Sequence, residues 1–211
     1  MQTRKGQEIE DESMKIIESE IGSHSYNEME WPIVRRIIHS TADFDFAGEN
    51  KLVFHKDAIT NGINALKNGR SIVADVNGVI GLMNKQNPKD FGNNMICNIS
   101  DSSLMESAKK AGKTRAQMSM RVAEKEIDGG IVVVGNAPTA LLEVMEMFRE
   151  GLVKPALVVG MPVGFVSAVE SKDELSKTEI PFITNIGRKG GSPCASAIIN
   201  ALYKLLRQGN N

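Results

Sequence analysis

Three glycine-rich loops carry the residues best suited to bind an anion. The strongest of them is "NIGRKGGSP", residues 185–193, where Arg188 and Lys189 stand directly before Gly190 and Gly191. Two cations beside glycines that expose backbone N–H groups bind an anion by charge and by hydrogen bonds. The spacing is not that of a P-loop and the chain has no G-x-G-x-x-G, so the loop gives little support to nucleotide binding.

The two other loops each follow a run of apolar residues. Gly135 and Asn136 follow "IVVV" and precede Pro138, so their amides lie at a predicted helix N-terminus, where free N–H groups favour an anion. Gly164 ends the second loop, "GMPVG", which follows "ALVV". Glycine and proline at a strand-to-helix junction often serve turn geometry alone, and we favour that interpretation for each of these two loops taken by itself.

A second set of candidates surrounds His39 in the stretch "RRIIHSTADFDFA". We expect a helix to end near His39, and the negative end of its dipole favours an imidazolium, which can donate a proton. Arg36 lies one turn earlier on the same face, either as part of a surface pair or as a cation beside a catalytic imidazole. By periodicity alone, a structural role for the histidine is the more frequent case.

Further candidates stand around this segment and at two other helices. Acids and phenylalanines alternate from Asp43 to Phe46, which predicts a short extended segment with the rings on one side. Arg115 follows Thr114 ahead of an amphipathic helix, where its side chain either meets a ligand or stays exposed. Ser13 lies in the first predicted helix without a motif of its own, and a solvent-facing hydroxyl is the default interpretation.

A parallel sheet would bring the three loops together. Five short apolar runs are predicted strands, at residues 70–76, 94–100, 129–138, 154–164 and 180–187. Apolar spacing of three and four predicts helices at residues 8–20, 27–40, 101–112, 115–127 and 138–151. Because the strand runs are apolar throughout, we expect burial on both faces, and so a three-layer αβα sandwich with a mainly parallel sheet and two helices ahead of it. Ligands bind at the carboxyl ends of such strands.

Composition restricts the class of protein. With 211 residues and 41% hydrophobic residues, the chain suits a single domain over residues 1–211. The 25 Lys and Arg residues against 26 Asp and Glu residues argue against a nucleic-acid partner. No leader and no apolar run near the roughly 20 residues of a membrane span is apparent, which predicts a soluble cytoplasmic protein. Cys97 and Cys194 are isolated, so we expect reduced thiols, and no His or Cys spacing indicates a metal site.

Four segments, taken together and in order, resemble the signature segments of the precorrin-8X methylmutases, also known as cobalt-precorrin-8 methylmutases, of cobalamin biosynthesis. They are "RRIIHSTADFDFA", "GNAPTALLEV", "PALVVGMPVGFVSAVESKDEL" and "GRKGGSPCASAIINAL". The resemblance extends from about Ile9 to Leu206, nearly the whole chain.

This resemblance implies an isomerase that moves a methyl group from C-11 to C-12 of the tetrapyrrole, giving hydrogenobyrinate or cobyrinate without an added cofactor. It also implies a flavodoxin-like sheet and a homodimer with active sites near the subunit interface. The family's catalytic histidine corresponds to His39, which would donate a proton or a strong hydrogen bond to the macrocycle. The family's serine in the first helix corresponds to Ser13, and its Thr-Arg pair to Thr114 and Arg115.

The substrate of that family carries several carboxylates around a flat apolar ring, which suits distributed cations and glycine-rich loops. We expect this role for Arg36, Arg115, Arg188 and Lys189. Two segments depart from the family's pattern: Ala42 replaces its usual glycine, and residues 75–85 differ after "DV". Both a metal-free and a cobalt-containing substrate remain open, with cobalt arriving only inside the substrate.

Two alternatives remain. A protein that binds the tetrapyrrole product and passes it on would use the same loops, but would not need a proton donor at the ring. A flavodoxin-like nucleotide binder would use residues 187–192.

Overall fold

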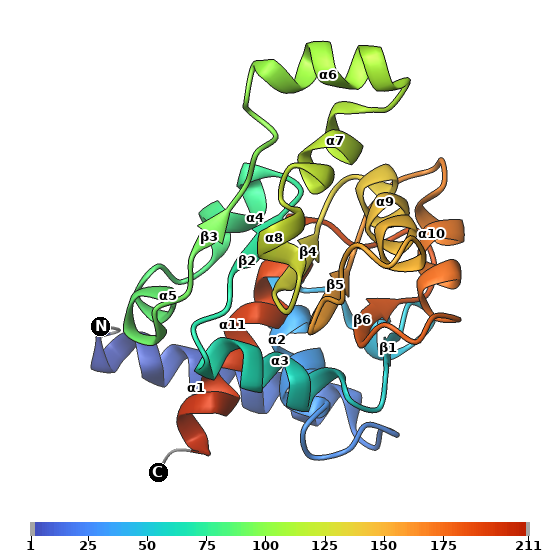
Figure 1. Cartoon of the computed structure of the whole chain (residues 1–211). Helices are drawn as coiled ribbons and strands as arrows, with labels where there is room; N and C mark the ends of the chain where they lie inside the picture. The colour runs from blue at the N-terminus through green and yellow to red at the C-terminus, as the bar shows by residue number, and fades with distance from the viewer. Residues whose placement is uncertain (1–2, 210–211) are drawn as a thin grey trace.

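The computed structural model describes residues 3–209, which fold around one six-stranded sheet (Figure 1). The strands lie in the order β1-β6-β5-β4-β2-β3. Their bounds are β1 Leu52–Phe54, β2 Ile72–Ala74, β3 Met95–Ile96, β4 Ile131–Val134, β5 Leu157–Gly160 and β6 Phe182–Asn185. All neighbours are parallel except β1, which pairs with β6 in the antiparallel direction. The predicted mainly parallel sheet is confirmed.

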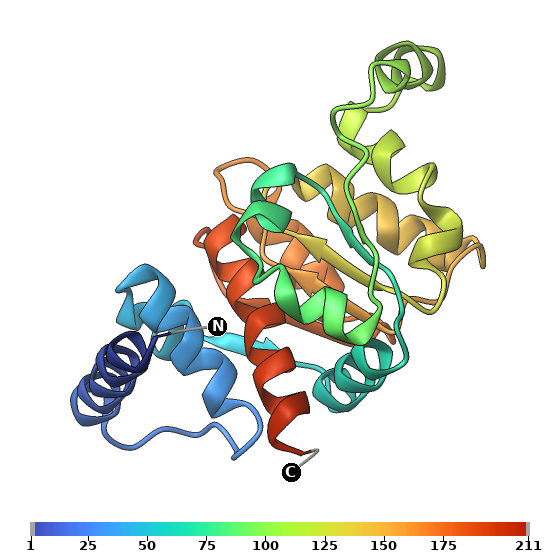
Figure 2. The same cartoon turned by 90° about the vertical axis from the view of Figure 1, so that its left-hand side faces the viewer.

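Helices cover both faces of the sheet. One face carries α1 Arg4–Ile21, α2 Trp31–Thr41, α3 Ala58–Lys67, α4 Asn77–Leu82, α5 Gln86–Phe91 and α11 Ser192–Gln208. The other carries α7 Arg115–Arg121, α8 Glu124–Ile127, α9 Pro138–Arg149 and α10 Ala168–Leu175. Helix α6, Ser103–Ala111, projects from the body beside α7 (Figures 1 and 2). The predicted three-layer sandwich is confirmed, and α1 and α2 are its two additional helices.

The continuous apolar runs become strands because both faces of the sheet are covered. In β4, Ile131 and Val133 belong to the core that includes α2 and α11, whereas Val132 and Val134 pack with α9. All four are fully buried. In the part of the chain that the structure describes, no helix has both the length and the apolar character needed to span a bilayer.

Helix α2 positions His39, and its sequence explains both of its ends. Pro32 lies in the first turn, where a missing N–H costs nothing. The buried face packs on α11 and consists of Ile33, Val34, Ile37 and Ile38. Full burial of each such side chain contributes roughly 1.5–3 kcal/mol, so this face anchors the helix. The helix ends at Ala42, which adopts a left-handed conformation with φ 53° and ψ 32°.

Two local predictions were wrong, and one strand was missed. The segment from Asp43 to Phe46 is not extended, because the Asp43 carboxylate accepts the N–H of Asp45 at 3.0 Å and starts a 3₁₀ turn, η1 Phe44–Ala47. The helix predicted over residues 115–127 divides into α7 and α8. Strand β1 was not predicted, because it is a short edge strand bounded by polar residues.

Candidate active site

His39 lies in the last turn of α2 and faces a cleft of about 300 Å³. The opposite wall is α1, which contributes Ser13, Ile16, Ile17 and Glu20. Phe44, whose side chain is partly exposed, also lines the cleft. The hydroxyl of Ser13 donates a hydrogen bond of 2.8 Å to the Ile9 carbonyl, which leaves its oxygen able to accept. The structure therefore brings Ser13 and His39 to one partly apolar cleft.

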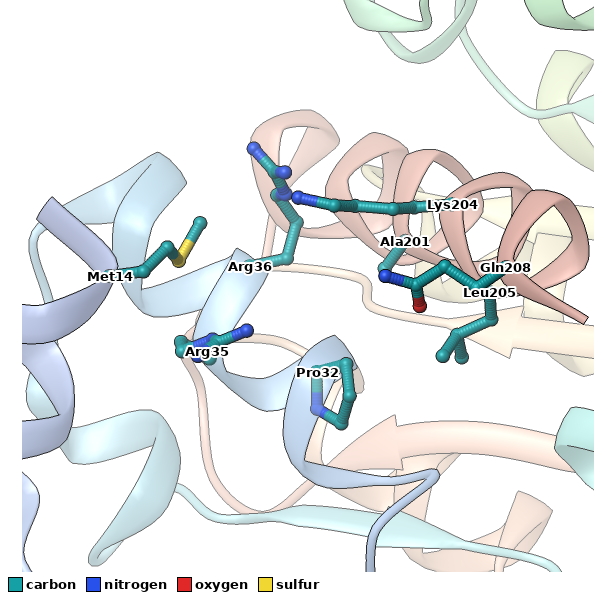
Figure 3. Close-up of a pocket in the computed structure, with 8 residues that line it drawn as sticks. All are labelled: Met14, Pro32, Arg35, Arg36, Ala201, Lys204, Leu205 and Gln208. Carbon is teal, nitrogen blue, oxygen red and sulfur yellow. The ribbon is translucent and has the colours of Figure 1, made fainter. Parts of the chain in front are cut away.

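Two cations meet a single carboxylate next to this cleft. Glu10 Oε1 lies 2.6 Å from Arg36 Nη2 and 3.0 Å from Lys204 Nζ. Burial raises the pKa of Glu10, but hydrogen bonds and charge from Arg36 and Lys204 outweigh this and lower it to about 2. Figure 3 shows the Arg36 and Lys204 side chains extending toward one another from α2 and α11. Arg36 is thus a cation paired with Glu10 one helical turn before His39, and its place beside a catalytic imidazole stays a prediction.

These cations line two further hollows between the helices. One of about 110 Å³ lies among Met14, Arg35 and Arg36, with Leu205 of α11 on its other side (Figure 3). A larger one of about 460 Å³ extends past Lys204 to amide and cationic side chains, which are Gln7, Asn84, Asn87, Asn200 and Arg207. Sequence reasoning did not identify Lys204, because a lysine in the last helix resembles any solvated lysine.

The predicted imidazolium at His39 needs correction. Burial lowers the pKa of His39 below its usual 6.5, and the charges of Arg36 and Lys204 lower it further, while Glu10 acts in the opposite direction. Desolvation and neighbouring cations outweigh the helix dipole. This environment therefore favours the neutral imidazole, which offers one N–H donor.

The backbone N–H groups of the loop after β4 bind an anion, and this anion is a side chain of the protein itself. The buried carboxylate of Asp75 accepts hydrogen bonds from the backbone N–H groups of Gly135, Asn136 and Ala137 at 2.8, 2.8 and 2.7 Å. Burial raises the pKa of Asp75, and the three amide donors oppose that rise. The amides of Gly135 and Asn136 are thus occupied, whereas the Asn136 side chain is exposed. Asp75 directly follows β2, the neighbour of β4, but sequence reasoning did not connect it to this loop.

The loops after β5 and β6 lie against each other. The N–H of Gly164 donates to the Arg188 carbonyl at 3.3 Å, and the Arg188 guanidinium lies 5.6 Å from the centre of the Phe165 ring. A Cβ atom at Gly190 would lie 2.5 Å from the Met161 carbonyl oxygen, so this approach requires glycine. The structure therefore brings Gly164, Arg188, Lys189, Gly190 and Gly191 together.

Lys189 connects this pair of loops to the segment after His39. Its ammonium lies 2.7 Å from Asp43 Oδ2 and 2.6 Å from Asp45 Oδ2. These two ion pairs raise the pKa of Lys189. Lys189 is thus already paired with the corner formed by residues 43–45, and Arg188 is the exposed cation of the loop.

Arg115 does not reach His39 within one chain. It begins α7 on the opposite face of the sheet from α1 and α2 (Figure 1). Thr114 caps α7 through reciprocal hydrogen bonds with Gln117 of 3.1 and 2.9 Å. Within residues 3–209 the Arg115 side chain has no hydrogen-bond or ion-pair partner, and it is exposed. The structure therefore separates Arg115 from Ser13 and His39.

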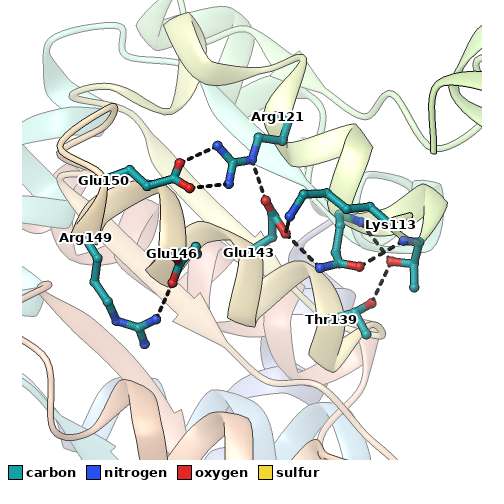
Figure 4. Close-up of polar contacts among 9 residues, drawn as sticks. Lys113, Arg121, Thr139, Glu143, Glu146, Arg149 and Glu150 are labelled. Atoms are coloured by element: carbon teal, nitrogen blue, oxygen red, sulfur yellow. Dashed lines mark hydrogen bonds and ion pairs between the residues drawn. The ribbon is translucent and has the colours of Figure 1, made fainter. Parts of the chain in front are cut away.

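A buried carboxylate of α9 holds α7 and the preceding turn to the body. Glu143 is 2% exposed and lies 2.9 Å from Lys113 Nζ and 2.8 Å from Gln117 Nε2, with Arg121 as its third partner (Figure 4). Burial raises the pKa of Glu143, but these three donors lower it overall. The start of α7, which carries Arg115, is thus held to α9. No cluster of three or more His, Cys, Asp or Glu side chains in residues 3–209 could hold a metal ion.

Comparison with known proteins places this arrangement in one family. The sequence pattern of the precorrin-8X methylmutases matches residues 8–205. The chain is 50% identical to the cobalt-precorrin-8 methylmutase of Priestia megaterium, over 96% of this chain and 89% of the relative. It is 46% identical to the protein of the same name from Leptospira interrogans, over 96% and 95% of the two chains.

A solved structure gives the same answer for the fold. The precorrin-8x methyl mutase from Thermus thermophilus superposes with a TM-score of 0.90 at 39% identity, covering 97% of this chain and 98% of that one. The resemblance of the four sequence segments is confirmed. The chain belongs to the precorrin-8X methylmutase family, isomerases of cobalamin biosynthesis.

Proposed function

We propose that this chain moves a methyl group from C-11 to C-12 of cobalt-precorrin-8 and gives cobyrinate, with His39 as the donor to the macrocycle. One observation carries the proposal: His39 and Ser13 face a partly apolar cleft beside two cations that already hold a carboxylate. A flat ring with peripheral acetates and propionates needs an apolar wall and nearby cations.

The cobalt-containing substrate is favoured over the metal-free one by the names of the relatives. The two curated relatives at 50% and 46% identity are both called cobalt-precorrin-8 methylmutases. Cobalt enters this proposal as part of the substrate. The reaction is an intramolecular rearrangement in which one carbon–carbon bond breaks and another forms, so we infer that it uses no added cofactor.

The proposed role of His39 follows from the charges around it. A methyl shift around a conjugated ring needs electron density drawn away from the rearranging carbons, and a donor at the ring does this. A substrate carboxylate that pairs with Arg36 and Lys204 would weaken their effect on His39, raise its pKa and favour the imidazolium. General acid assistance of this kind contributes about 10²–10⁴-fold, or roughly 3–5 kcal/mol.

The experiment that tests this function is conversion of excess cobalt-precorrin-8 by the purified protein, followed by visible absorption. Methyl migration changes the conjugation, so an isomerase changes the spectrum of many substrate molecules for each protein molecule. The product is then identified by the position of the methyl group in its NMR spectrum. Binding of cobyrinate without any conversion of substrate would contradict the proposal and support the carrier alternative.

We also infer a homodimer in which the start of α7, with Arg115, approaches α1 of a second copy. Helix α6 and the start of α7 present cations, which are Lys109, Arg115 and Lys110, the last paired with Glu106 of its own helix, and the exposed Met105. Helix α1 presents exposed acids, which are Glu8, Asp11 and Glu12, and exposed apolar side chains at Ile9 and Ile16. Opposite charges around apolar centres favour contact between these two surfaces.

Mixed dimers test this arrangement directly. A His39→Ala subunit and an Arg115→Ala subunit are each expected to be inactive as homodimers. If the partner subunit's Arg115 completes the cleft, mixing the two variants restores one intact site in each mixed dimer, or about a quarter of wild-type activity. No recovery in mixtures that ultracentrifugation shows to be dimeric would contradict the arrangement. We infer a cytoplasmic location as well, which cell fractionation tests.

A further inference from the structure

Lys172 is a buried lysine that the proposed reaction does not use. Its side chain in α10 is 1% exposed, and within residues 3–209 it has no carboxylate partner. The ammonium donates instead to two neutral acceptors, the Lys189 carbonyl at 2.7 Å and Asn185 Oδ1 at 3.1 Å. A buried ammonium without a counter-ion is costly. Because burial of this charge is costly, we look for its role in the segment that it contacts, at residues 185–189.

Asn185 completes the same set of contacts from the end of β6. It is 1% exposed, and its Nδ2 donates to the carbonyls of Ile186 at 2.8 Å and Lys189 at 3.0 Å. The Lys189 carbonyl thus accepts from both buried side chains. Together Lys172 and Asn185 hold the two ends of the turn that carries Arg188.

This turn depends on such support because three of its residues are glycines. Gly187, Gly190 and Gly191 adopt φ values of 83°, 159° and 110°, in the region that favours glycine. Glycine gains more conformational freedom on release than any other residue. Fixed carbonyls at both ends of the turn therefore decide whether it keeps one conformation.

The turn at residues 186–191 also contacts the corner at residues 43–45, which follows His39. The Lys189 ammonium pairs with Asp43 and Asp45, and Asp43 starts the 3₁₀ turn after α2. We propose that Lys172 is a positioning residue. With Asn185 it fixes the turn at residues 186–191, so that Lys189 keeps its ion pairs with the corner at residues 43–45, beside His39. Its effect on substrate binding rests on the proposed function. The contacts by which Lys172 and Asn185 hold the turn, here called the clamp, do not.

The electrostatics of the site agree with this geometry. Burial lowers the pKa of Lys172 to about 8, and the Asp173 carboxylate of its own helix opposes this. Burial raises the pKa of Cys194 to about 12, so the thiol is neutral. Its Sγ lies 3.3 Å from the Gly190 carbonyl, on the same turn.

The test compares Lys172→Met with Lys177→Met, which removes an exposed lysine just beyond the same helix. The first readout is limited digestion with trypsin, which cuts after Arg188 and Lys189 only when the turn opens. We expect Lys172→Met to be cut there about tenfold faster than wild type, because a charged hydrogen bond to the turn is lost. Lys177→Met should be cut at the wild-type rate.

The second readout separates positioning from general stability. Methionine removes a buried charge, so the Tm of Lys172→Met should be equal to or above that of wild type. KM should rise about tenfold while kcat changes less than twofold, because the turn contributes equally to ground-state and transition-state binding. Wild-type cleavage at residues 188–189 together with unchanged KM would overturn the proposal, as would a fall in Tm that accounts for the lost activity.

A second variant keeps the proposal testable if Lys172→Met does not fold. Asn185→Asp preserves size and gives Lys172 a carboxylate, but it removes both amide donors to the turn. The same tryptic sensitivity is expected, and protection at the wild-type level would contradict the clamp. If wild type itself fails to convert substrate, the proposed function is wrong, while the tryptic result still decides the role of Lys172.

Discussion

The carboxylate of Asp75 accepts a hydrogen bond of 2.8 Å from the backbone N–H of Gly135, which lies 60 residues later in the sequence. Two more amides of the same turn donate to it. We expect Asp75→Asn to destabilise the fold by about 2–3 kcal/mol, because an amide NH₂ would face a backbone donor in a buried site. Urea denaturation measures the change. The exposed Asp173→Asn serves as the control and should differ from wild type by less than about 0.5 kcal/mol.

The left-handed conformation of Ala42 predicts a stabilising substitution. An alanine at φ 53° carries strain that glycine avoids. Ala42→Gly should therefore raise the free energy of unfolding by about 0.5–1 kcal/mol, after the entropy gained by the unfolded glycine is subtracted. Ala111→Gly, in the last turn of α6, should lower stability instead. A loss of stability in Ala42→Gly would show that the methyl group makes a packing contact that outweighs the strain.

The pKa of His39 should respond in opposite directions to its two kinds of neighbour. Lys204 lowers the pKa of His39 and Glu10 raises it. Lys204→Met should therefore move the imidazole titration, followed by NMR, to higher pH, and Glu10→Gln should move it to lower pH. Lys125→Met, an exposed change in α8, is the control and should leave the titration unchanged. Shifts of the same sign in the first two variants would contradict the charge arrangement.

The lowered pKa of Lys172 predicts that the free energy of unfolding rises at alkaline pH. Its pKa is about 8 in the folded protein against 10.5 for an ordinary lysine. Between these values the unfolded chain binds the extra proton, so the free energy of unfolding increases as the pH rises from about 8 to about 10. Denaturation of wild type and Lys172→Met across this pH range measures the contribution of Lys172 to the free energy of unfolding. An identical pH dependence in both proteins would mean that Lys172 keeps an ordinary pKa.

The sheet and its loops could be predicted from sequence because buried parallel strands leave an unbroken apolar run. Residues 131–134 are the clearest case, and the turn that follows them was correctly placed at a helix start. What could not be predicted was the identity of the anion there. Asp75 reaches that turn only through the pairing of β2 with β4, which local sequence does not specify.

The candidate site also contains features that the sequence alone could not predict. Ser13 was assigned through the family resemblance alone, and its hydroxyl has no sequence signal of its own. Lys172, in "AVESKDEL", resembles a solvated lysine between acids, and its burial depends on how α10 packs on β6. The neutral state of His39 also depends on tertiary packing, because the cation Lys204 comes from the last helix.

The central claim is that His39 acts as a donor to the ring during methyl migration. The most direct test is single-turnover conversion of cobalt-precorrin-8 by excess enzyme, followed by visible absorption. His39→Ala and His39→Gln are compared with wild type and with Ser40→Ala, a change at an exposed neighbour. We predict that Ser40→Ala converts substrate at the wild-type rate. His39→Ala should bind substrate but convert it about 10²–10⁴-fold more slowly. His39→Gln keeps an N–H donor but cannot release a proton, so its rate should be intermediate or equal to that of His39→Ala. Conversion by His39→Ala at the wild-type rate would contradict the claim and make His39 a structural residue of the cleft.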